Sequence, residues 1–191
     1  MAVRRERADA ARNRRAILQA TETLLAEHRP GDVSIERVAA KAGVSKGTVF
    51  HRFGSRTGLM VELMKERAAG LQELVTEGAP PLGPGAPAGE RLLAFLSAVV
   101  EVVGRNKGLL AALGIAVTPP RDGGERPVYR FWHGHVSALL TEARPDLDAE
   151  VVADLLLACL HAEPTLRMLE RGEADRVASA LHAMALGLIG E

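Results

Sequence analysis

Four consecutive residues, Ser45, Lys46, Gly47 and Thr48, carry the most specific chemistry in this sequence. A serine before a helix accepts a hydrogen bond from a free backbone N–H, and its hydroxyl can also bond a phosphate. Lysine supplies a charge for phosphates, glycine lets the backbone approach closely, and threonine can contact a base edge or a phosphate. These residue types, placed at the exposed start of a helix, predict a surface for duplex DNA.

Two short helices joined by a tight turn would present this surface. The first begins after Ser34, and Gly43 ends it because glycine can adopt the positive φ of a helix end. The second begins after Ser45 and is expected to run from Lys46 to His51. A helix, a glycine-containing turn and a second short helix form a helix-turn-helix. The apolar residues at i, i+3 and i+4 that predict the buried face of the first helix are Ile35, Val38 and Ala39.

Other side chains near the turn are candidates for the same interface. Ser34 can cap a helix and bond a phosphate, while His51 and Arg56 are placed to reach phosphates. Val49 is either a core residue or a contact for a thymine methyl group, and either Phe50 or Phe53 must point inward. The predicted DNA-binding residues are Ser34, Ser45, Lys46, Gly47, Thr48, Val49, Phe50, His51 and Arg56.

Charge is unevenly spread along the chain. The 24 basic and 24 acidic side chains balance overall, but residues 1–67 hold 14 Lys and Arg against 8 Asp and Glu. The basic first third is therefore expected to meet a polyanion, and the acidic remainder is not. An Arg-rich arm supplies part of this charge and is predicted to be solvated or to touch phosphates or a minor groove. Its members are Arg4, Arg5, Arg7, Arg12, Arg14 and Arg15.

Cysteine usage and hydropathy restrict the class of protein. Cys159 is the single cysteine, so the sequence excludes an intrachain disulfide and predicts a small buried residue in a reducing, cytoplasmic compartment. No apolar run reaches about 18 residues, so we expect no membrane span. The sequence has no glycine-rich phosphate loop, no pair of residues at metal-ligand spacing and no nucleophile with its base. We therefore predict that the protein is not an enzyme and has no catalytic residue, no cofactor and no metal site.

Helical periodicity runs through the rest of the chain, and no segment alternates with period two, so the fold class is all-α with about nine helices. We predict a DNA-binding domain over 1–55 and a ligand-binding and dimerisation domain over 56–191. Residues 1–8 are expected to be irregular, residues 78–89 to be a Pro/Gly-rich loop, and Pro164 to bend one long helix. The expected helices are 9–28, 56–77, 90–105, 107–117, 125–143, 149–170 and 174–189, besides the two of the helix-turn-helix.

The run AGVSKGTVFHRFGSRTGL, from Ala42 to Leu59, resembles the tetracycline-repressor (TetR) family of bacterial transcription regulators. Phe50 departs from the family pattern, where Tyr is common and its hydroxyl reaches a phosphate. Arg52, where His is common, can compensate for that bond. The resemblance implies a homodimer that binds a palindromic DNA operator and is released by a small-molecule effector. It covers residues 9–65 closely and the remainder only in size and helical layout.

The implied homodimer with its small-molecule effector predicts two further sets of residues. The first set also has the ordinary interpretation of a buried core. The set expected to line an effector cavity is Phe95, Leu113, Tyr129, Trp132, His133 and Met168. The set expected in a dimer interface is Leu156, Leu160, Val177, Leu181, Met184 and Leu188.

The function predicted from the sequence is therefore a ligand-responsive repressor, and two alternatives stay open. One is a DNA-binding activator or nucleoid-associated regulator that has no small-molecule ligand. The other is a chain that keeps the fold as a protein-interaction module, which the basic first third argues against.

Overall fold

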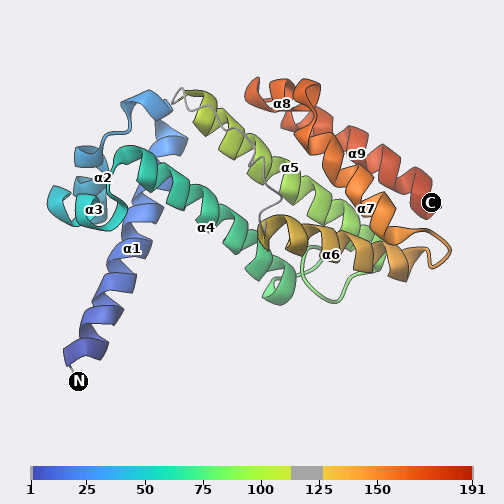
Figure 1. Ribbon diagram of the computed structural model, residues 1–191, viewed down its shortest axis with the longest axis horizontal. Helices are drawn as coiled ribbons and strands as arrows, with labels where there is room; N and C mark the ends of the chain where they lie inside the picture. The colour runs from blue at the N-terminus through green and yellow to red at the C-terminus, as the bar shows by residue number, and fades with distance from the viewer. Residues whose placement is uncertain (1, 113–126, 191) are drawn as a thin grey trace. The chain divides into compact units, whose positions relative to one another are not determined.

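The computed structural model describes residues 2–112 and 127–190, and all regular secondary structure within those ranges is helical (Figure 1). This confirms the all-α prediction. Two short 3-10 turns, Pro30–Asp32 and Cys159–His161, interrupt the order of α-helices. The α-helices of the described ranges are α1 (Ala2–Glu27), α2 (Ile35–Ala42), α3 (Lys46–Phe53), α4 (Arg56–Glu77), α5 (Ala88–Ala112), α6 (Pro127–Ala143), α7 (Ala149–Ala158), α8 (Glu163–Glu170) and α9 (Ala174–Ile189).

Two compact units divide the chain within α4. The first holds α1, α2, α3 and α4 as far as Glu66, and the second begins at Arg67 and holds the rest of α4 with the later helices. One continuous helix therefore contributes to both units. The domain boundary predicted between residues 55 and 56 stays a prediction.

The core of the first unit forms around one stripe of α1. Ile17, Ala20 and Leu24 are buried at helical spacing, and the buried Thr21 hydroxyl is satisfied because it donates to the Ile17 carbonyl at 2.8 Å. Helix α2 packs on α1 and on α3. Burial of this stripe therefore holds the two short helices in place.

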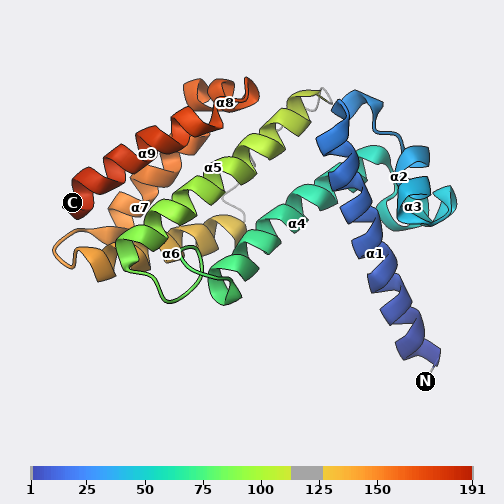
Figure 2. The same ribbon diagram turned by 180° about the vertical axis from the view of Figure 1, so that it is seen from behind.

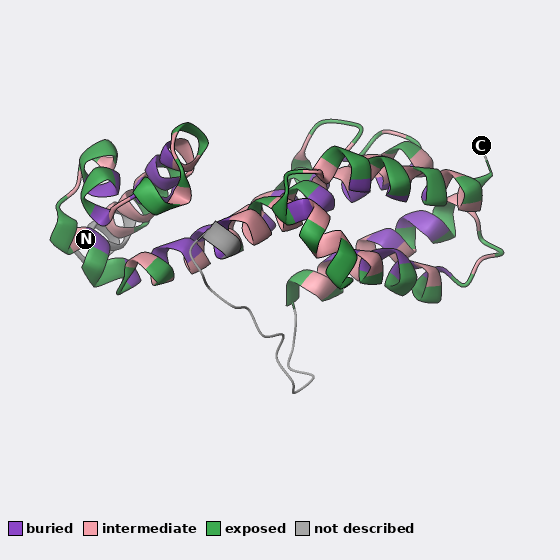
Figure 3. Ribbon diagram, turned by 90° about the horizontal axis from the view of Figure 1, so that it is seen from above, coloured by how far each residue is buried: buried purple, intermediate pink, exposed green. Residues whose placement is uncertain are grey.

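Helix α5 is the central element of the second unit, as its apolar sequence predicts (Figure 2). Phe95, Leu96 and Val99 are fully buried, and side chains of α6, α7 and α9 complete one continuous core with them. Figure 3 shows buried residues along one side of the surrounding helices and exposed residues along the other. Such amphipathic helices are stable only when a neighbour covers the apolar side.

Two predicted boundaries are wrong. Helix α1 begins at Ala2 rather than at residue 9, because the first residues are good helix formers without glycine or proline. Helix α5 continues to Ala112 instead of ending near residue 105, and residues 113–117 of the short helix predicted after it lie outside the described residues.

Pro164 does not bend one long helix. The chain leaves the helical conformation at Ala162, where ψ is 134°, and Pro164 occupies the first turn of the separate helix α8. Proline is tolerated in a first turn because the N–H that it lacks would have no partner there.

Candidate nucleic-acid interface

The turn between α2 and α3 has the local geometry that its sequence predicts. The Ser34 hydroxyl accepts from the backbone N–H of Arg37 at 3.3 Å, and the Ser45 hydroxyl accepts from that of Thr48 at 3.0 Å. Gly43 ends α2 with φ 67°, a left-handed conformation in which its N–H reaches α2 carbonyls. Each helix is therefore capped by the serine that precedes it, and Ser45 fixes where α3 begins.

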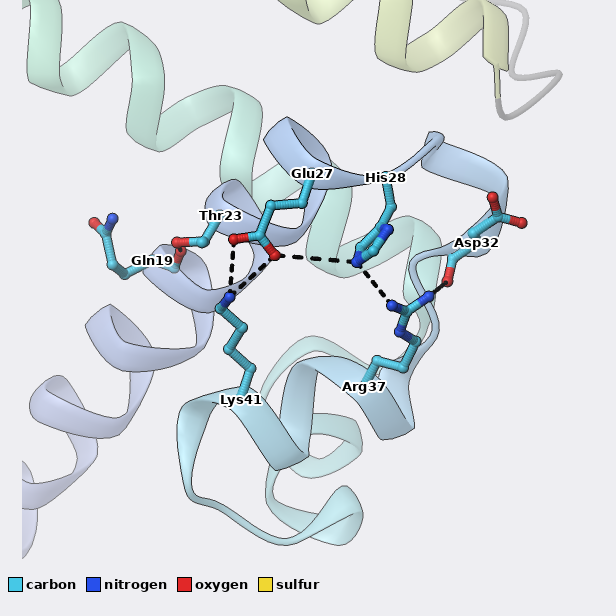
Figure 4. Close-up of polar contacts among 7 residues, drawn as sticks. All are labelled: Gln19, Thr23, Glu27, His28, Asp32, Arg37 and Lys41. Atoms are coloured by element: carbon cyan, nitrogen blue, oxygen red, sulfur yellow. Dashed lines mark hydrogen bonds and ion pairs between the residues drawn. The ribbon is translucent and has the colours of Figure 1, made fainter.

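A group of charged side chains ties α2 to the end of α1 (Figure 4). Lys41 donates to both carboxylate oxygens of Glu27 at 3.2 Å. Arg37 donates to Nε2 of His28 at 2.8 Å and to the backbone oxygen of Asp32 at 3.2 Å. Because a guanidinium can only donate, His28 must accept through Nε2 and carry its proton on Nδ1. These bonds orient α2, and through it the start of α3.

The start of α3 is an exposed polar surface. Lys46 and Gly47 are exposed, and Thr48 is half-buried with its hydroxyl 2.8 Å from that of Ser45. His51 is also exposed, one turn further along the helix. Hydroxyl groups, a cation and accessible backbone thus share the first turn, which is the combination that suits phosphates and base edges.

Lys46 has an acidic partner that the sequence-based reasoning missed. Its ammonium forms an ion pair with Glu36 of α2 and lies 5.6 Å from the centre of the Phe50 ring. The hydrogen bond from Lys46, helped by bonds from the backbone and Ser34, lowers the pKa of Glu36 to about 2. A phosphate must therefore share Lys46 with Glu36 or displace it. No local sequence signal pairs these residues, because the contact depends on how α2 crosses α3.

Two predicted interface residues serve the fold instead. Val49 is 0% exposed, so its side chain has no surface to offer a thymine methyl group, and the core interpretation is correct. Phe53 is the aromatic side chain that points inward, while Phe50 is 42% exposed. Arg56 donates from Nε to the Val33 carbonyl at 2.9 Å and from Nη2 to the Pro30 carbonyl, so it braces the loop before α2 rather than extending into solvent.

The Arg-rich arm separates into different roles. Arg14, expected on the exposed side of its helix, donates to Glu66 at 2.7 Å and to Glu62 at 3.2 Å on α4. The bond to Glu66 raises the pKa of the Arg14 guanidinium above its ordinary value. Arg12 is paired with Asp9, and Arg15 is exposed. The side chains of the other three members, at positions 4, 5 and 7, lie outside the described residues.

The residues predicted to line an effector cavity fall into two places. Phe95 and Trp132 lie in the core of the second unit, and Met168 packs against it. Tyr129 also packs against this core, but its hydroxyl donates to the carboxylate of Asp154 at 2.8 Å, and His133 Nε2 lies 3.2 Å from the Glu150 carbonyl oxygen. Leu113 lies outside the described residues.

A cavity of about 700 Å³ lies elsewhere in the second unit, between α4 and α5. Leu71 and Val102 form part of its apolar wall, and Arg67, which donates to Asn106 at 3.0 Å, lies at its polar side. Burial lowers the pKa of Arg67. None of the described effector candidates lines this cavity. Within the described ranges, no group of His, Cys, Asp and Glu side chains could hold a metal ion.

Four of the six residues predicted for a dimer interface are buried within their own chain. Leu156 is 1% exposed and belongs to the core of the second unit. Leu160, Val177 and Leu181 are buried in the same core. Met184, at 48% exposed, keeps its predicted place on the surface, and Leu188 is half-buried.

The exposed apolar residues of the last helices lie on different stripes. On α7 they are Val151 and Leu155, the latter 62% exposed, at i and i+4. On α9 the exposed Ala180, Met184 and Gly187 share one face. Among the described residues, no helix is long and apolar enough to cross a membrane.

The first part of the chain matches a known family. Residues 17–63 match the model of bacterial regulatory proteins, tetR family. Over 65 residues the chain is 34% identical to the HTH-type transcriptional repressor AcnR of Corynebacterium glutamicum. The aligned region covers 34% of this chain and 35% of that protein. AcnR of Corynebacterium diphtheriae is 33% identical over 64 residues, 34% of either chain. The match thus spans about a third of the length of these relatives.

Solved structures share the fold over nearly the whole chain. A TetR-family transcriptional regulator from Pectobacterium atrosepticum has a TM-score of 0.62 at 19% identity, covering 97% of this chain and 98% of that one. A TetR-like transcriptional regulator from Rhodococcus sp. RHA1 has a TM-score of 0.51 at 21% identity, covering 94% and 97%. The helix-turn-helix segment of this chain therefore belongs to the tetR family of bacterial regulatory proteins, and the whole chain has the fold of that family's solved members.

Proposed function

We propose that this chain is a bacterial transcriptional repressor that binds a palindromic operator as a homodimer and is released by a small-molecule effector. The observation that carries the proposal is the capped, exposed start of α3, where Lys46, Gly47 and Thr48 stand together on the surface. In a helix-turn-helix protein, the second helix lies in the major groove with its N-terminal residues against base edges.

The first unit supports DNA binding by charge as well as by shape. Residues 1–67 carry six more basic than acidic side chains, while the rest of the chain carries six more acidic ones. Phosphate contacts from Lys46, His51 and the exposed Arg52 would fix the orientation of α3, and Thr48 would contact a base or a phosphate. Such binding would take place in the cytoplasm, where bacterial DNA lies.

The exposed apolar stripes of α7 and α9 favour a dimer. Leu155, Val151 and Met184 are large apolar side chains that stay exposed in the single chain. A two-fold partner would bury them, because a self-complementary patch is the commonest way in which identical chains associate. Two α3 helices would then meet half-sites about 34–36 Å apart, or a multiple of that spacing.

Effector control is proposed to act through α4, which contributes to both units. Its first half holds Arg14 through Glu62 and Glu66, and its second half forms one wall of the cavity beside α5. A ligand in the second unit that displaces α4 would disturb the helices of the first unit. Coupling between two sites is typically about 1–3 kcal/mol.

A DNA-fragment selection followed by binding assays tests the proposal. Thr48→Ala and Lys46→Gln should each weaken binding to the selected fragment about tenfold or more, since a good base contact is worth about 1–3 kcal/mol. The matched control is Lys65→Gln, which removes a charge from an exposed lysine on α4. Equal binding by all three variants would refute the assignment of α3, and a footprint upstream of the promoter would favour an activator.

A further inference from the structure

Three buried side-chain nitrogen atoms have no hydrogen-bond partner among the described residues: Arg91 Nε, Trp132 Nε1 and His135 Nε2. Arg91 lies near the start of α5, and the other two lie within one turn of α6. A buried donor without an acceptor costs free energy, so native proteins pair nearly all such groups. Three of them on two neighbouring segments of one core require an explanation.

His135 is held in an apolar setting by two aromatic rings. Its ring meets Phe95 edge-on, with centroids 4.7 Å apart, and lies parallel to Phe131 at 6.1 Å. Burial, and then the positive charge of Arg91, lowers the pKa of His135 below its ordinary value. The half-buried Phe131 ring provides apolar surface beside the unpaired His135 nitrogen, and the charge of Arg91 acts on the same histidine.

Arg91 makes this place electropositive. Throughout the described ranges, no carboxylate lies within ion-pair distance of its guanidinium, although the chain carries 24 acidic residues. A half-buried cation beside a histidine favours a negatively charged partner, and a guanidinium matches the two oxygens of a carboxylate.

We propose that Arg91, Trp132 and His135 bind the carboxylate of an organic acid, whose apolar body rests against the half-buried ring of Phe131. Trp132 donates through Nε1, Arg91 donates through its guanidinium, and His135 donates through Nε2 in the tautomer or charge state that the acid selects. This inference rests on the proposed function in that it names the chemical class of the effector. Trp132 and Phe95 were expected from the sequence to line an effector site, whereas Arg91 and His135 were not.

Trp132 is the single tryptophan of the chain, so intrinsic fluorescence reports on this place alone. The full-length protein is titrated with benzoate, hexanoate and 4-phenylbutyrate, and with the primary amide of each acid. At least one carboxylate should change the fluorescence saturably, and its amide should bind about tenfold more weakly or worse, because hydrogen bonds to charged groups are the stronger ones. Failure of all three acids to bind, or equal binding of acid and amide, would overturn the proposal.

Variants separate the proposed role of Arg91 from a general effect of charge. Arg91→Gln should weaken binding of that carboxylate about tenfold while leaving amide binding unchanged. Arg105→Gln removes the same charge at the cavity between α4 and α5 and should change neither. Equal carboxylate binding by Arg91→Gln and the unaltered protein would show that buried water satisfies the three nitrogen atoms instead.

A second variant covers the case in which Arg91→Gln does not fold, as judged by circular dichroism. His135→Phe keeps a ring between Phe95 and Phe131 but removes both nitrogen atoms, so it should also weaken the carboxylate selectively. The titrations need no DNA. Absence of carboxylate selectivity in the unaltered protein therefore contradicts this inference alone, whereas failure of the unaltered protein to bind any selected DNA contradicts the proposed function alone.

Discussion

The helix-turn-helix and the C-terminal unit differ in where their structural information lies. In α2 and α3, the residues that cap the helices are within three positions of the groups they satisfy, as Ser34 and Ser45 show. In the second unit, the decisive contacts join residues far apart in the chain, such as His182 and the Leu93 carbonyl at 3.0 Å. A surface built from local contacts can be recognised in the sequence, whereas a surface built from contacts between distant residues can be identified only in the structure.

The neighbouring leucines of α7 offer the largest test of this difference. Leu156 is 1% exposed and Leu155 is 62% exposed. Leu156→Ala should lower the free energy of unfolding by about 2–5 kcal/mol, the usual cost of removing a buried leucine. Leu155→Asp should keep the helical circular dichroism and shift the sedimentation profile from dimer to monomer. A Leu155→Asp chain that stays dimeric would remove α7 from the proposed interface.

Adjacent residues of α3 give a smaller test. Val49→Ala should cost about 1–3 kcal/mol of stability, because Val49 is fully buried. Phe50→Ala should change stability by about 0.5 kcal/mol or less and weaken DNA binding, because Phe50 is exposed beside Lys46. Chemical denaturation and a DNA titration measure the two effects, and the reverse pattern would place Val49, not Phe50, at the DNA surface.

Sequence-based predictions were correct where a structural feature depends only on residues a few positions apart. The caps, the left-handed Gly43 and the buried stripe of α1 all follow from spacing within a few residues. Sequence reasoning did not anticipate that Leu156, Leu160, Val177 and Leu181 are buried in their own chain, because a helix with apolar residues on two sides does not indicate which side faces its own core. It could not find the contact of Glu36 with Lys46, which depends on the crossing of two helices.

Two glycines of α4 give a prediction of still smaller size. A Cβ added at Gly70 would meet nothing within 4 Å, so Gly70→Ala should stabilise the protein by about 0.4–1 kcal/mol. A Cβ at Gly58 would collide with the Phe53 carbonyl oxygen, so Gly58→Ala should destabilise it. Thermal unfolding compares them, and a destabilised Gly70→Ala would mean that the backbone of α4 packs more closely than described.

The smallest expected effect is the pH dependence contributed by His135. Its pKa is lowered in the folded chain, so the unfolded chain binds more protons near the ordinary value of 6.5. This contribution to stability is present above pH 6.5 and is lost as the pH falls toward the folded pKa. His135→Phe should flatten the fall in melting temperature between about pH 7 and pH 5. An unchanged slope would show that other groups set the acid sensitivity.

The central claim is that α3 reads DNA as one of a pair, and the salt dependence of binding tests it most directly. We predict that the protein selects a palindromic fragment and binds it as a dimer. The logarithm of the binding constant should fall linearly with that of salt concentration, with a slope of about −0.9 for each phosphate contacted. Lys46→Gln should reduce that slope by about one for each α3, or about two for the dimer. A selected fragment without two-fold symmetry, or affinity independent of salt, would contradict the account.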